Sequence, residues 1–132
     1  MFRPSDSFSS FAVPDLDAAR RFYGETLGLD VGMEPEMGML ELRVGTGRPV
    51  LVYIKPDHRP AVFTVLNFAV PDIDDAVAQL KAAGVEMERY DVPDAQPDAN
   101  GVYRGDQGPA IAWFTDPAGN ILSVLQEGSS PS

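Results

Sequence analysis

The sequence contains no cysteine and only one histidine, His58, among its 132 residues. The lack of cysteine excludes disulfides, thiolate metal sites and cysteine nucleophiles. A single histidine excludes any site that takes two or more imidazoles from one chain. His58 stands beside Arg59 in a proline-flanked segment, where we expect it to be exposed to solvent rather than bound to a metal.

Basic residues are few: ten Lys and Arg face twenty Asp and Glu, which gives a formal net charge of −10. Nucleic acids and anionic membranes are both bound through clustered cations, so neither is an expected partner. The chain also lacks any apolar run near the roughly 18 residues of a membrane span. Its first residues include Arg3 and Asp6 without an apolar core, so we expect no signal peptide and a cytoplasmic location.

The clearest positive feature is an internal repeat. The segment Phe11–Asp17 (FAVPDLD) returns 57 residues later as Phe68–Asp74 (FAVPDID). A repeat of this period indicates two copies of one supersecondary unit. Within a single domain of residues 1–132, we expect module 1 at about 7–56, a linker at about 56–60, module 2 at about 61–127, and a disordered tail at 128–132.

Each copy of the repeat ends at the start of a predicted helix. Asp15 and Asp72 both follow a proline, and their carboxylates can accept hydrogen bonds from the free amides of a first helical turn. After Asp72, apolar residues recur at helical spacing as far as Gly84, a natural helix stop. The same pattern after Asp15 predicts a helix that ends near Gly28.

Strands are predicted before and after each helix, because these segments combine apolar or alternating residues with flanking turn signals. The predicted strands are residues 8–13, 39–44, 49–55, 62–70, 85–92, 110–115 and 120–126. The sequence Asp116–Gly119 predicts a hairpin turn between the last two. The polar, Gly- and Pro-rich segment 93–107 is either a binding lid or a mobile loop.

Alternation in the first strand of each copy separates two faces. Phe11 and Val13, with the matching residues of the second copy, share the side that we expect to pack beneath the helix. The other side carries Ser10 and Asn67 at matching positions. These polar residues either face a cavity or form hydrogen bonds with the neighbouring backbone.

Three features occur together: Phe11–Leu16 followed by Phe22–Tyr23 and Leu27–Gly28, a second copy that runs through Gly84, and the turn Phe114–Asn120. In this combination the sequence resembles the vicinal oxygen chelate superfamily, which includes glyoxalase I, bleomycin-resistance proteins and extradiol dioxygenases. The resemblance implies an α+β fold in which two tandem βαβββ modules form a curled mixed sheet around a cup, commonly in a homodimer.

The resemblance also implies metal-ligand positions in the cup: the residue seven before each helix-capping Asp, and the residue three after the Asn of the final turn. These positions hold Phe8, Val65 and Ser123, and the remaining one, in the first module, falls at Leu51 or Val52. None of them offers the carboxylate or imidazole that divalent cations need. We therefore expect no metal and no cofactor.

Without metal ligands, the cup is expected to be an aromatic pocket with a few hydrogen-bonding groups, the usual composition of a small-molecule site. Trp113 can stack on a planar ligand or hold a cation over its ring. The alternative for Trp113 and Tyr53 is a place in the core of the sheet. The candidate ligand-binding residues are Phe8, Ser10, Tyr53, Val65, Asn67, Tyr103, Trp113 and Ser123.

These features favour a metal-free protein, similar to glyoxalase and bleomycin-resistance proteins, that binds a small planar or cationic organic ligand and has no catalytic residue. The alternative is an enzyme of the superfamily, a lyase, isomerase or dioxygenase, with non-standard metal ligands or no metal. Glu41, Asp57 or Glu127 would then be a base if its side chain reached the cup. A third possibility is a protein whose partner is another protein.

Overall fold

The computed structural model describes residues 1–34, 36, 38–91, 95–105 and 108–127. The disordered tail expected at 128–132, and both ends of the predicted loop 93–107, lie outside this part. The chain divides into two compact units, Met1–Arg59 (unit 1) and Pro60–Ser132 (unit 2). In the described residues, no helix is long and apolar enough to cross a membrane.

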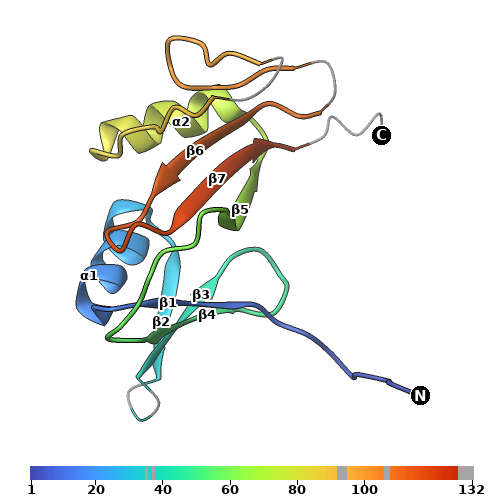
Figure 1. Ribbon diagram of the computed structural model, residues 1–132, viewed down its shortest axis with the longest axis vertical. Helices are drawn as coiled ribbons and strands as arrows, with labels where there is room; N and C mark the ends of the chain where they lie inside the picture. Colours follow the sequence, from blue (N-terminus) through green and yellow to red (C-terminus); the bar gives the residue numbers. More distant parts are fainter. Residues whose placement is uncertain (35, 37, 92–94, 106–107, 128–132) are drawn as a thin grey trace. The chain divides into compact units, whose positions relative to one another are not determined.

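Unit 1 is a βαβββ module (Figure 1). Its strand order is β1-β4-β3-β2, with β1 parallel to β4 and the other neighbours antiparallel. Phe11 and Val13 of β1 are buried, as predicted. Its elements are β1 (Ser10–Val13), α1 (Leu16–Arg21), the π-helix η1 (Phe22–Thr26), β2 (Asp30–Glu34), β3 (Met39–Arg43) and β4 (Val50–Ile54).

Unit 2 repeats most of this arrangement, as the repeat in the sequence predicts. Its sheet has the order β5-β7-β6, with β5 parallel to β7 and β6 antiparallel to β7. Two sheets with few helices make the α+β fold expected from the sequence. The elements of unit 2 are β5 (Thr64–Val70), α2 (Ile73–Ala82), β6 (Ile111–Thr115) and β7 (Ile121–Gln126).

The prediction of a strand at 85–92 is wrong for the described residues, 85–91. In this segment a single antiparallel bridge joins Glu88 to Trp113 of β6. The amide of Glu88 donates to the carbonyl of Trp113 at 2.7 Å. The next pair along this ladder would join Tyr90 to Ile111, but Ile111 exchanges both of its backbone hydrogen bonds with Tyr103. The segment therefore borders β6 without becoming a strand.

Both helices begin at the residues that the sequence predicts. Asp15 accepts a backbone N–H of the first turn of α1 at 3.1 Å, and Asp72 accepts two from α2 at 3.1 and 3.2 Å. Gly84 follows α2 with a φ of 92°. The first helix continues as η1, where the amide of Leu27 donates to the carbonyl of Phe22 at 2.8 Å. The position of this end agrees with the prediction, whereas its π geometry was not predicted.

β2 lies in a segment for which the sequence predicts no strand, because Gly32 at its centre weakens the strand pattern. The guanidinium of Arg43 covers Gly32, and a side chain at this position would collide with it. Arg43, at the end of β3, also forms an ion pair with Asp30 of β2 at 3.3 Å. Contacts with β3 therefore place a strand where the local sequence does not call for one.

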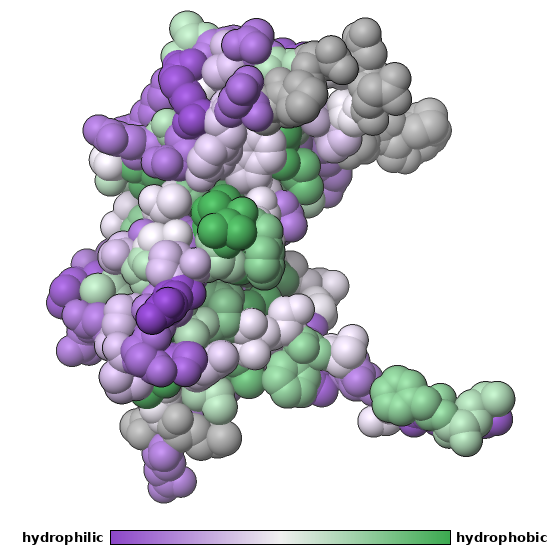
Figure 2. Space-filling view, in the orientation of Figure 1, coloured by the Kyte–Doolittle hydropathy of each residue, from purple (hydrophilic) through white to green (hydrophobic). Residues whose placement is uncertain are grey.

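The core of unit 2 lies between α2 and one face of its sheet. Phe68 pairs with Val124 in the β5–β7 register and so shares this face, as the alternation predicts. The opposite side of α2 is hydrophilic, and Figure 2 shows polar side chains gathered over this helix. Buried apolar residues of this core are Ile73, Val77, Ala112, Phe114, Leu122 and Val124.

Candidate functional site

The sheet face opposite α2 carries a row of residues from neighbouring strands of unit 2. Asn67 of β5 lies opposite Ser123 of β7, and Ser123 lies opposite Trp113 of β6. Glu88 extends the row through its bridge to Trp113. Because directly paired residues project to the same face, one large aromatic ring stands between polar side chains.

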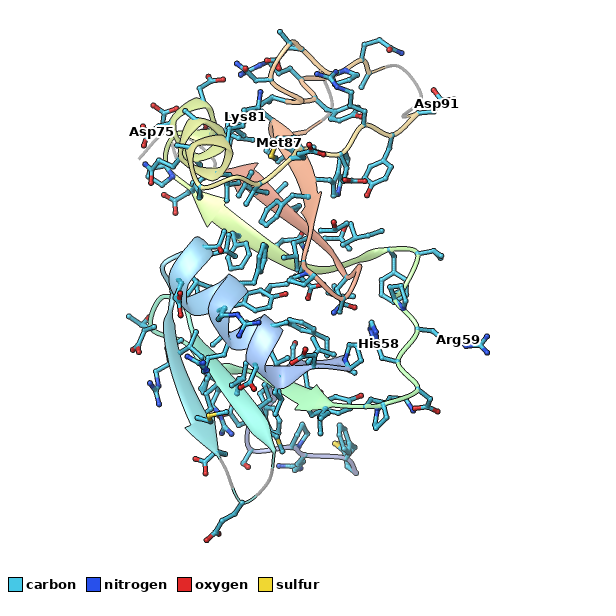
Figure 3. All side chains as sticks on the ribbon, turned by 90° about the vertical axis from the view of Figure 1, so that its left-hand side faces the viewer. His58, Arg59, Asp75, Lys81, Met87 and Asp91 are labelled. Atoms are coloured by element: carbon cyan, nitrogen blue, oxygen red, sulfur yellow. The ribbon has the colours of Figure 1, made fainter. Side chains whose placement is uncertain are left out.

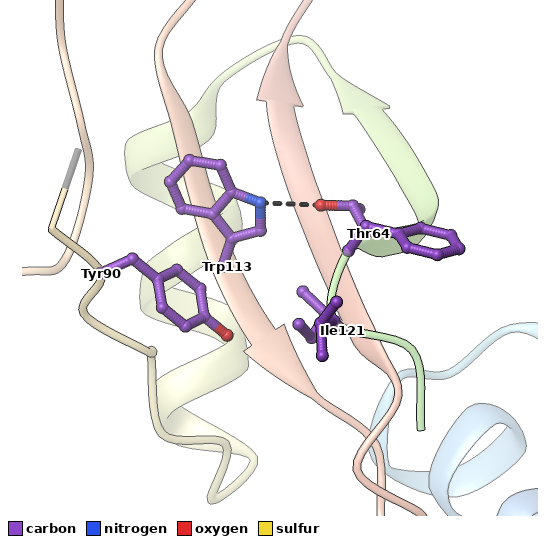
Figure 4. A pocket seen from close by; sticks show the side chains of 6 residues that line it. Thr64, Tyr90, Trp113 and Ile121 are labelled. Atoms are coloured by element: carbon purple, nitrogen blue, oxygen red, sulfur yellow. Dashed lines mark hydrogen bonds between the residues drawn. The ribbon is translucent and has the colours of Figure 1, made fainter. Parts of the chain in front are cut away.

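The indole of Trp113 is held in place by two rings and one hydrogen bond. Its ring centroid lies 5.6 Å from that of Tyr90 and 5.1 Å from that of Tyr103, and both contacts are edge-on. Its Nε1–H donates to Oγ1 of Thr64 at 3.0 Å, across β7 (Figure 4). These contacts limit the rotamers of Trp113, so its ring is preorganised.

A cavity of about 220 Å³ opens beside Trp113 (Figure 4). Most of its walls are apolar or aromatic, and Thr64, Tyr90 and Trp113 contribute the polar side-chain atoms. Val62 and Phe63 are 95% and 66% exposed, so the cavity is open to solvent on their side. Its lining residues are Val62, Phe63, Thr64, Tyr90, Trp113 and Ile121.

A β-bulge in β5 decides which residue of that strand reaches the cavity. Thr64 pairs with Ile121 and Leu66 pairs with Leu122, so the register shifts by one residue at Val65. Thr64 therefore takes the place opposite Ile121 that an unbroken alternation assigns to Val65. Val65 is half-buried and is not among the residues that line the cavity.

Tyr103 supports the site from behind and is not part of the cavity wall. Its side chain is 2% exposed, and its ring packs against Trp113. The Tyr103 hydroxyl accepts a hydrogen bond from the backbone N–H of Tyr90 and donates one to the Tyr90 carbonyl at 2.8 Å. These two bonds hold the backbone of Tyr90, whose own ring lines the cavity.

The segment that carries Tyr103 is an ordered turn tied to α2. Asp98 accepts two backbone N–H bonds from its own turn, at 2.8 and 3.0 Å. Arg104 reaches both Asp98, at 3.5 Å, and Asp74 of α2, at 2.5 Å. Burial opposes the ionisation of Asp98, but the backbone N–H bonds and Arg104 hold its pKa below the usual value. In its described part, 95–105, the predicted loop is therefore a structured support for the site.

Ser123 and Asn67 are joined by a hydrogen bond between their side chains. Ser123 is fully buried, and its hydroxyl donates to Oδ1 of Asn67 at 2.5 Å. The partner of Asn67 is thus a side chain of β7, where the sequence left a cavity or the neighbouring backbone as alternatives. Neither residue is among those that line the cavity.

Phe8, Ser10 and Tyr53 belong to unit 1, whereas all six residues that line the cavity belong to unit 2. Phe8 precedes β1 and is 56% exposed, with the guanidinium of Arg48 at 5.0 Å from its ring centroid. Ser10 and Tyr53 lie on the neighbouring strands β1 and β4 and are both exposed. Of the eight candidate ligand-binding residues, only Trp113 lines the cavity, and Tyr103 lies directly behind it.

The family model of the Glyoxalase/Bleomycin resistance protein/Dioxygenase superfamily matches residues 7–124. The chain belongs to this superfamily. The match confirms the resemblance that the repeat and the final turn indicated. Among curated proteins, none matches the sequence.

Solved structures of other proteins share the fold. A glyoxalase family protein from Bacillus anthracis has 20% identity and a TM-score of 0.68, over 96% of this chain and 99% of that one. The antibiotic-binding protein TnmS3 from a Streptomyces species has 22% identity and a TM-score of 0.65, over 96% and 100%. The fosfomycin resistance protein FosX from Listeria monocytogenes has 14% identity and a TM-score of 0.67, over 97% of both chains.

The positions at which the superfamily implies metal ligands do not fit a divalent cation in this member. The remaining ligand position, in the first module, is Leu51 in the register of unit 1. Leu51 pairs with Ser10 of β1 in the same way as Ser123 pairs with Asn67 of β5. The side chains of Phe8, Leu51 and Val65 have no donor atoms, and the Ser123 hydroxyl is already used within the sheet. In the described residues, no three His, Cys, Asp or Glu side chains are grouped as a metal site requires.

None of the three acids considered as bases is among the residues that line the cavity, and two of them form ion pairs. Glu41 pairs with Arg43 at 3.5 Å. Asp57 pairs with Lys55 at 2.8 Å, and this hydrogen bond lowers the pKa of Asp57. Glu127 follows the end of β7 and is exposed. None of them lines the cavity at Trp113.

Five lining residues were not predicted from the sequence. For Tyr90 a signal was present, since it lies two residues after Glu88 and alternation puts the two on one side of an extended segment. For Thr64 there was none, because the bulge that brings it to the cavity depends on pairing with β7. The unpredicted residues are Val62, Phe63, Thr64, Tyr90 and Ile121.

Proposed function

We propose that this member of the superfamily is a metal-free binding protein that holds a small planar organic molecule against Trp113. The cavity at Trp113 carries the proposal, because it is open to solvent, largely apolar and supplied with a few polar atoms. At about 220 Å³ it is smaller than the roughly 300–1,000 Å³ typical of sites for drug-sized ligands. It therefore suits one or two fused rings, or the planar part of a larger molecule.

The rigidity of the aromatic walls supports this function. Trp113 is fixed by Thr64 and Tyr103, and the backbone of Tyr90 is fixed by the Tyr103 hydroxyl. A ring that is already ordered loses little conformational entropy when a ligand stacks on it. Burial raises the pKa of Tyr90, with further contributions from Glu88 and Tyr103, so its hydroxyl stays protonated and able to donate a hydrogen bond.

Two proteins of the same fold suggest the class of ligand. One is described as antibiotic-binding and the other as a fosfomycin resistance protein. These descriptions support an antibiotic-like natural product as the ligand, and the aromatic walls of the cavity support a planar ring system within it.

The experiment that tests the proposal uses the sole tryptophan as its reporter. A panel of planar natural products is screened by thermal shift, and hits are titrated by fluorescence of Trp113. A ligand at about 100 times its Kd stabilises the protein by roughly 2.7 kcal/mol. Trp113→Leu is expected to abolish this stabilisation and Tyr53→Phe to leave it unchanged. If no member of the panel stabilises the protein, the proposal fails.

Metal analysis separates this function from the enzymatic alternative. We expect the purified protein to hold no near-stoichiometric Ni, Zn, Mn or Fe after dialysis, because Phe8, Val65 and Ser123 occupy the implied ligand positions. Metal that survives dialysis at one equivalent per chain would favour a lyase, isomerase or dioxygenase with other ligands.

We also propose that the protein is a cytoplasmic homodimer, since the superfamily resemblance implies a homodimer. Unit 1 carries apolar side chains that a second copy would cover: Met33, Val44 and Ile54 are 47%, 41% and 48% exposed. Light scattering coupled to size-exclusion chromatography tests this assembly, and a monomer across the micromolar range would refute it.

A further inference from the structure

We propose that the ligand held at Trp113 carries a positive charge, and that Glu88 is the residue that selects it. The inference rests on the proposed function and adds to it the chemical class of the ligand. Its basis is the position of Glu88, which is paired directly with Trp113 across the edge of β6. Paired residues project to the same face of a sheet, so the carboxylate stands on the side of the indole ring.

The carboxylate of Glu88 has no cation to neutralise it among the described residues. It is half-buried, and no Lys or Arg in this part of the chain forms an ion pair with it. The three basic residues of unit 2 are engaged elsewhere. Lys81 donates to the side chain of Asn100 at 3.1 Å, Arg89 donates to the carbonyl of Ala99 at 3.1 Å, and Arg104 pairs with Asp74 and Asp98; Figure 3 shows Lys81 on α2.

Unit 2 as a whole reinforces this negative charge. From Pro60 to Ser132 the sequence holds eleven acidic and three basic residues, which gives unit 2 a formal net charge of −8. The formal net charge of the whole chain is −10. A cleft in a surface of one sign concentrates ligands of the opposite sign. Glu88 is the acidic residue that the strand pairing brings to the aromatic row.

The aromatic walls and the carboxylate together favour a cation. The faces of Trp and Tyr rings attract a positive charge, and the attraction grows when the site excludes water. Glu88 does not line the cavity itself, but its backbone is paired with Trp113, which does. Its charge is also one of the secondary causes of the raised pKa of Tyr90, another lining residue. A neutral ring of the same shape gains only the stacking and apolar contacts, so charge is the property that distinguishes the two ligands.

Two probes of matched shape test the inference: N-methylquinolinium, which is cationic, and 1-methylnaphthalene, which is neutral. Binding is followed by NMR titration of the single indole N–H resonance, in the wild type and in Glu88→Gln. The variant is expected to bind the cation about tenfold more weakly and the neutral probe within about twofold of the wild type. Glu127→Gln removes the same charge from an exposed site at the end of β7 and is expected to change neither Kd.

The dependence of the wild-type Kd on salt is a second readout that needs no variant. Raising KCl should weaken the binding of the cation and leave that of the neutral probe unchanged. If both probes bind with a ratio that neither Glu88→Gln nor salt alters, selection by Glu88 is refuted and the binding function stands. If neither probe binds while planar neutral compounds from the panel do, the ligand is not a cation. If no compound of any kind binds, the proposed function itself fails.

Discussion

The indole N–H of Trp113 donates to Oγ1 of Thr64 at 3.0 Å and so joins the two outer strands of the unit 2 sheet across β7. The bond exists because the bulge at Val65 brings Thr64 opposite Ile121. One side-chain contact thus orients the ring on which the proposed ligand stacks. It also links the stability of unit 2 to the geometry of its cavity.

Replacing Thr64 with valine removes this acceptor and keeps the shape of the side chain. We expect Thr64→Val to lower the free energy of unfolding by about 1 kcal/mol, because the indole N–H loses its partner. Urea unfolding followed by the fluorescence of Trp113 measures the change. Thr46→Val, in an exposed turn, is the control and should stay within about 0.5 kcal/mol. Equal stability of the two variants would contradict the role of this bond.

Tyr103→Phe removes both hydrogen bonds to the backbone of Tyr90 and keeps the ring against Trp113. The loss should be about 1–3 kcal/mol, since the partner groups are half-buried. Hydrogen exchange at the Tyr90 amide should become faster, while amides in the core of β7 are affected only through global stability. Tyr53→Phe, on an exposed ring of β4, should change neither measurement. Unchanged exchange at Tyr90 would show that the hydroxyl does not hold this segment.

The lowered pKa of Asp98 predicts a loss of stability in acid. Its ionised form is favoured in the folded state by backbone N–H bonds and Arg104, although burial opposes it. The stabilisation is therefore present above the unfolded pKa of about 3.9 and disappears as pH falls through the lower folded pKa. Asp98→Asn should show a smaller difference in Tm between pH 7 and pH 3 than the wild type. Asp91→Asn, at an exposed site, serves as the control.

Gly101 is required by two features of its turn. Its φ is 88°, a conformation that side chains disfavour, and a Cβ there would lie 2.9 Å from Cβ of Met87. Gly101→Ala should therefore destabilise the protein by more than about 1 kcal/mol. Gly47→Ala, where a Cβ meets open space and φ is not positive, should be neutral or slightly stabilising. A neutral Gly101→Ala would mean that segment 95–105 rearranges at little energetic cost.

Much of the fold was predictable because its signals are local. The caps at Asp15 and Asp72 and the alternation in β1 act between residues that are close in the sequence, and the repeat presents such local signals twice. The predicted strand at 85–92 failed because Tyr103 competes for the backbone of Ile111. That competition is between segments distant in the chain, and no local pattern reports it.

The candidate site was predictable only in part, for the same reason. The sequence singled out Trp113, which lies on β6, and Tyr103, which is paired with β6 at Ile111. Their two rings are in contact. Thr64 was missed because one inserted residue in β5 interrupts the alternation of the strand and puts Thr64, in place of Val65, opposite Ile121.

By itself, the sequence determined the two modules, the helix boundaries and the absence of usual metal ligands at Phe8, Val65 and Ser123. These depend on residue identity and on short-range spacing. Only the tertiary structure decided that Thr64 and Tyr90 form the cavity with Trp113 and that Tyr103 supports it from behind. Register and competition for backbone partners are set by pairing between distant segments, so they arise only when the sheet assembles.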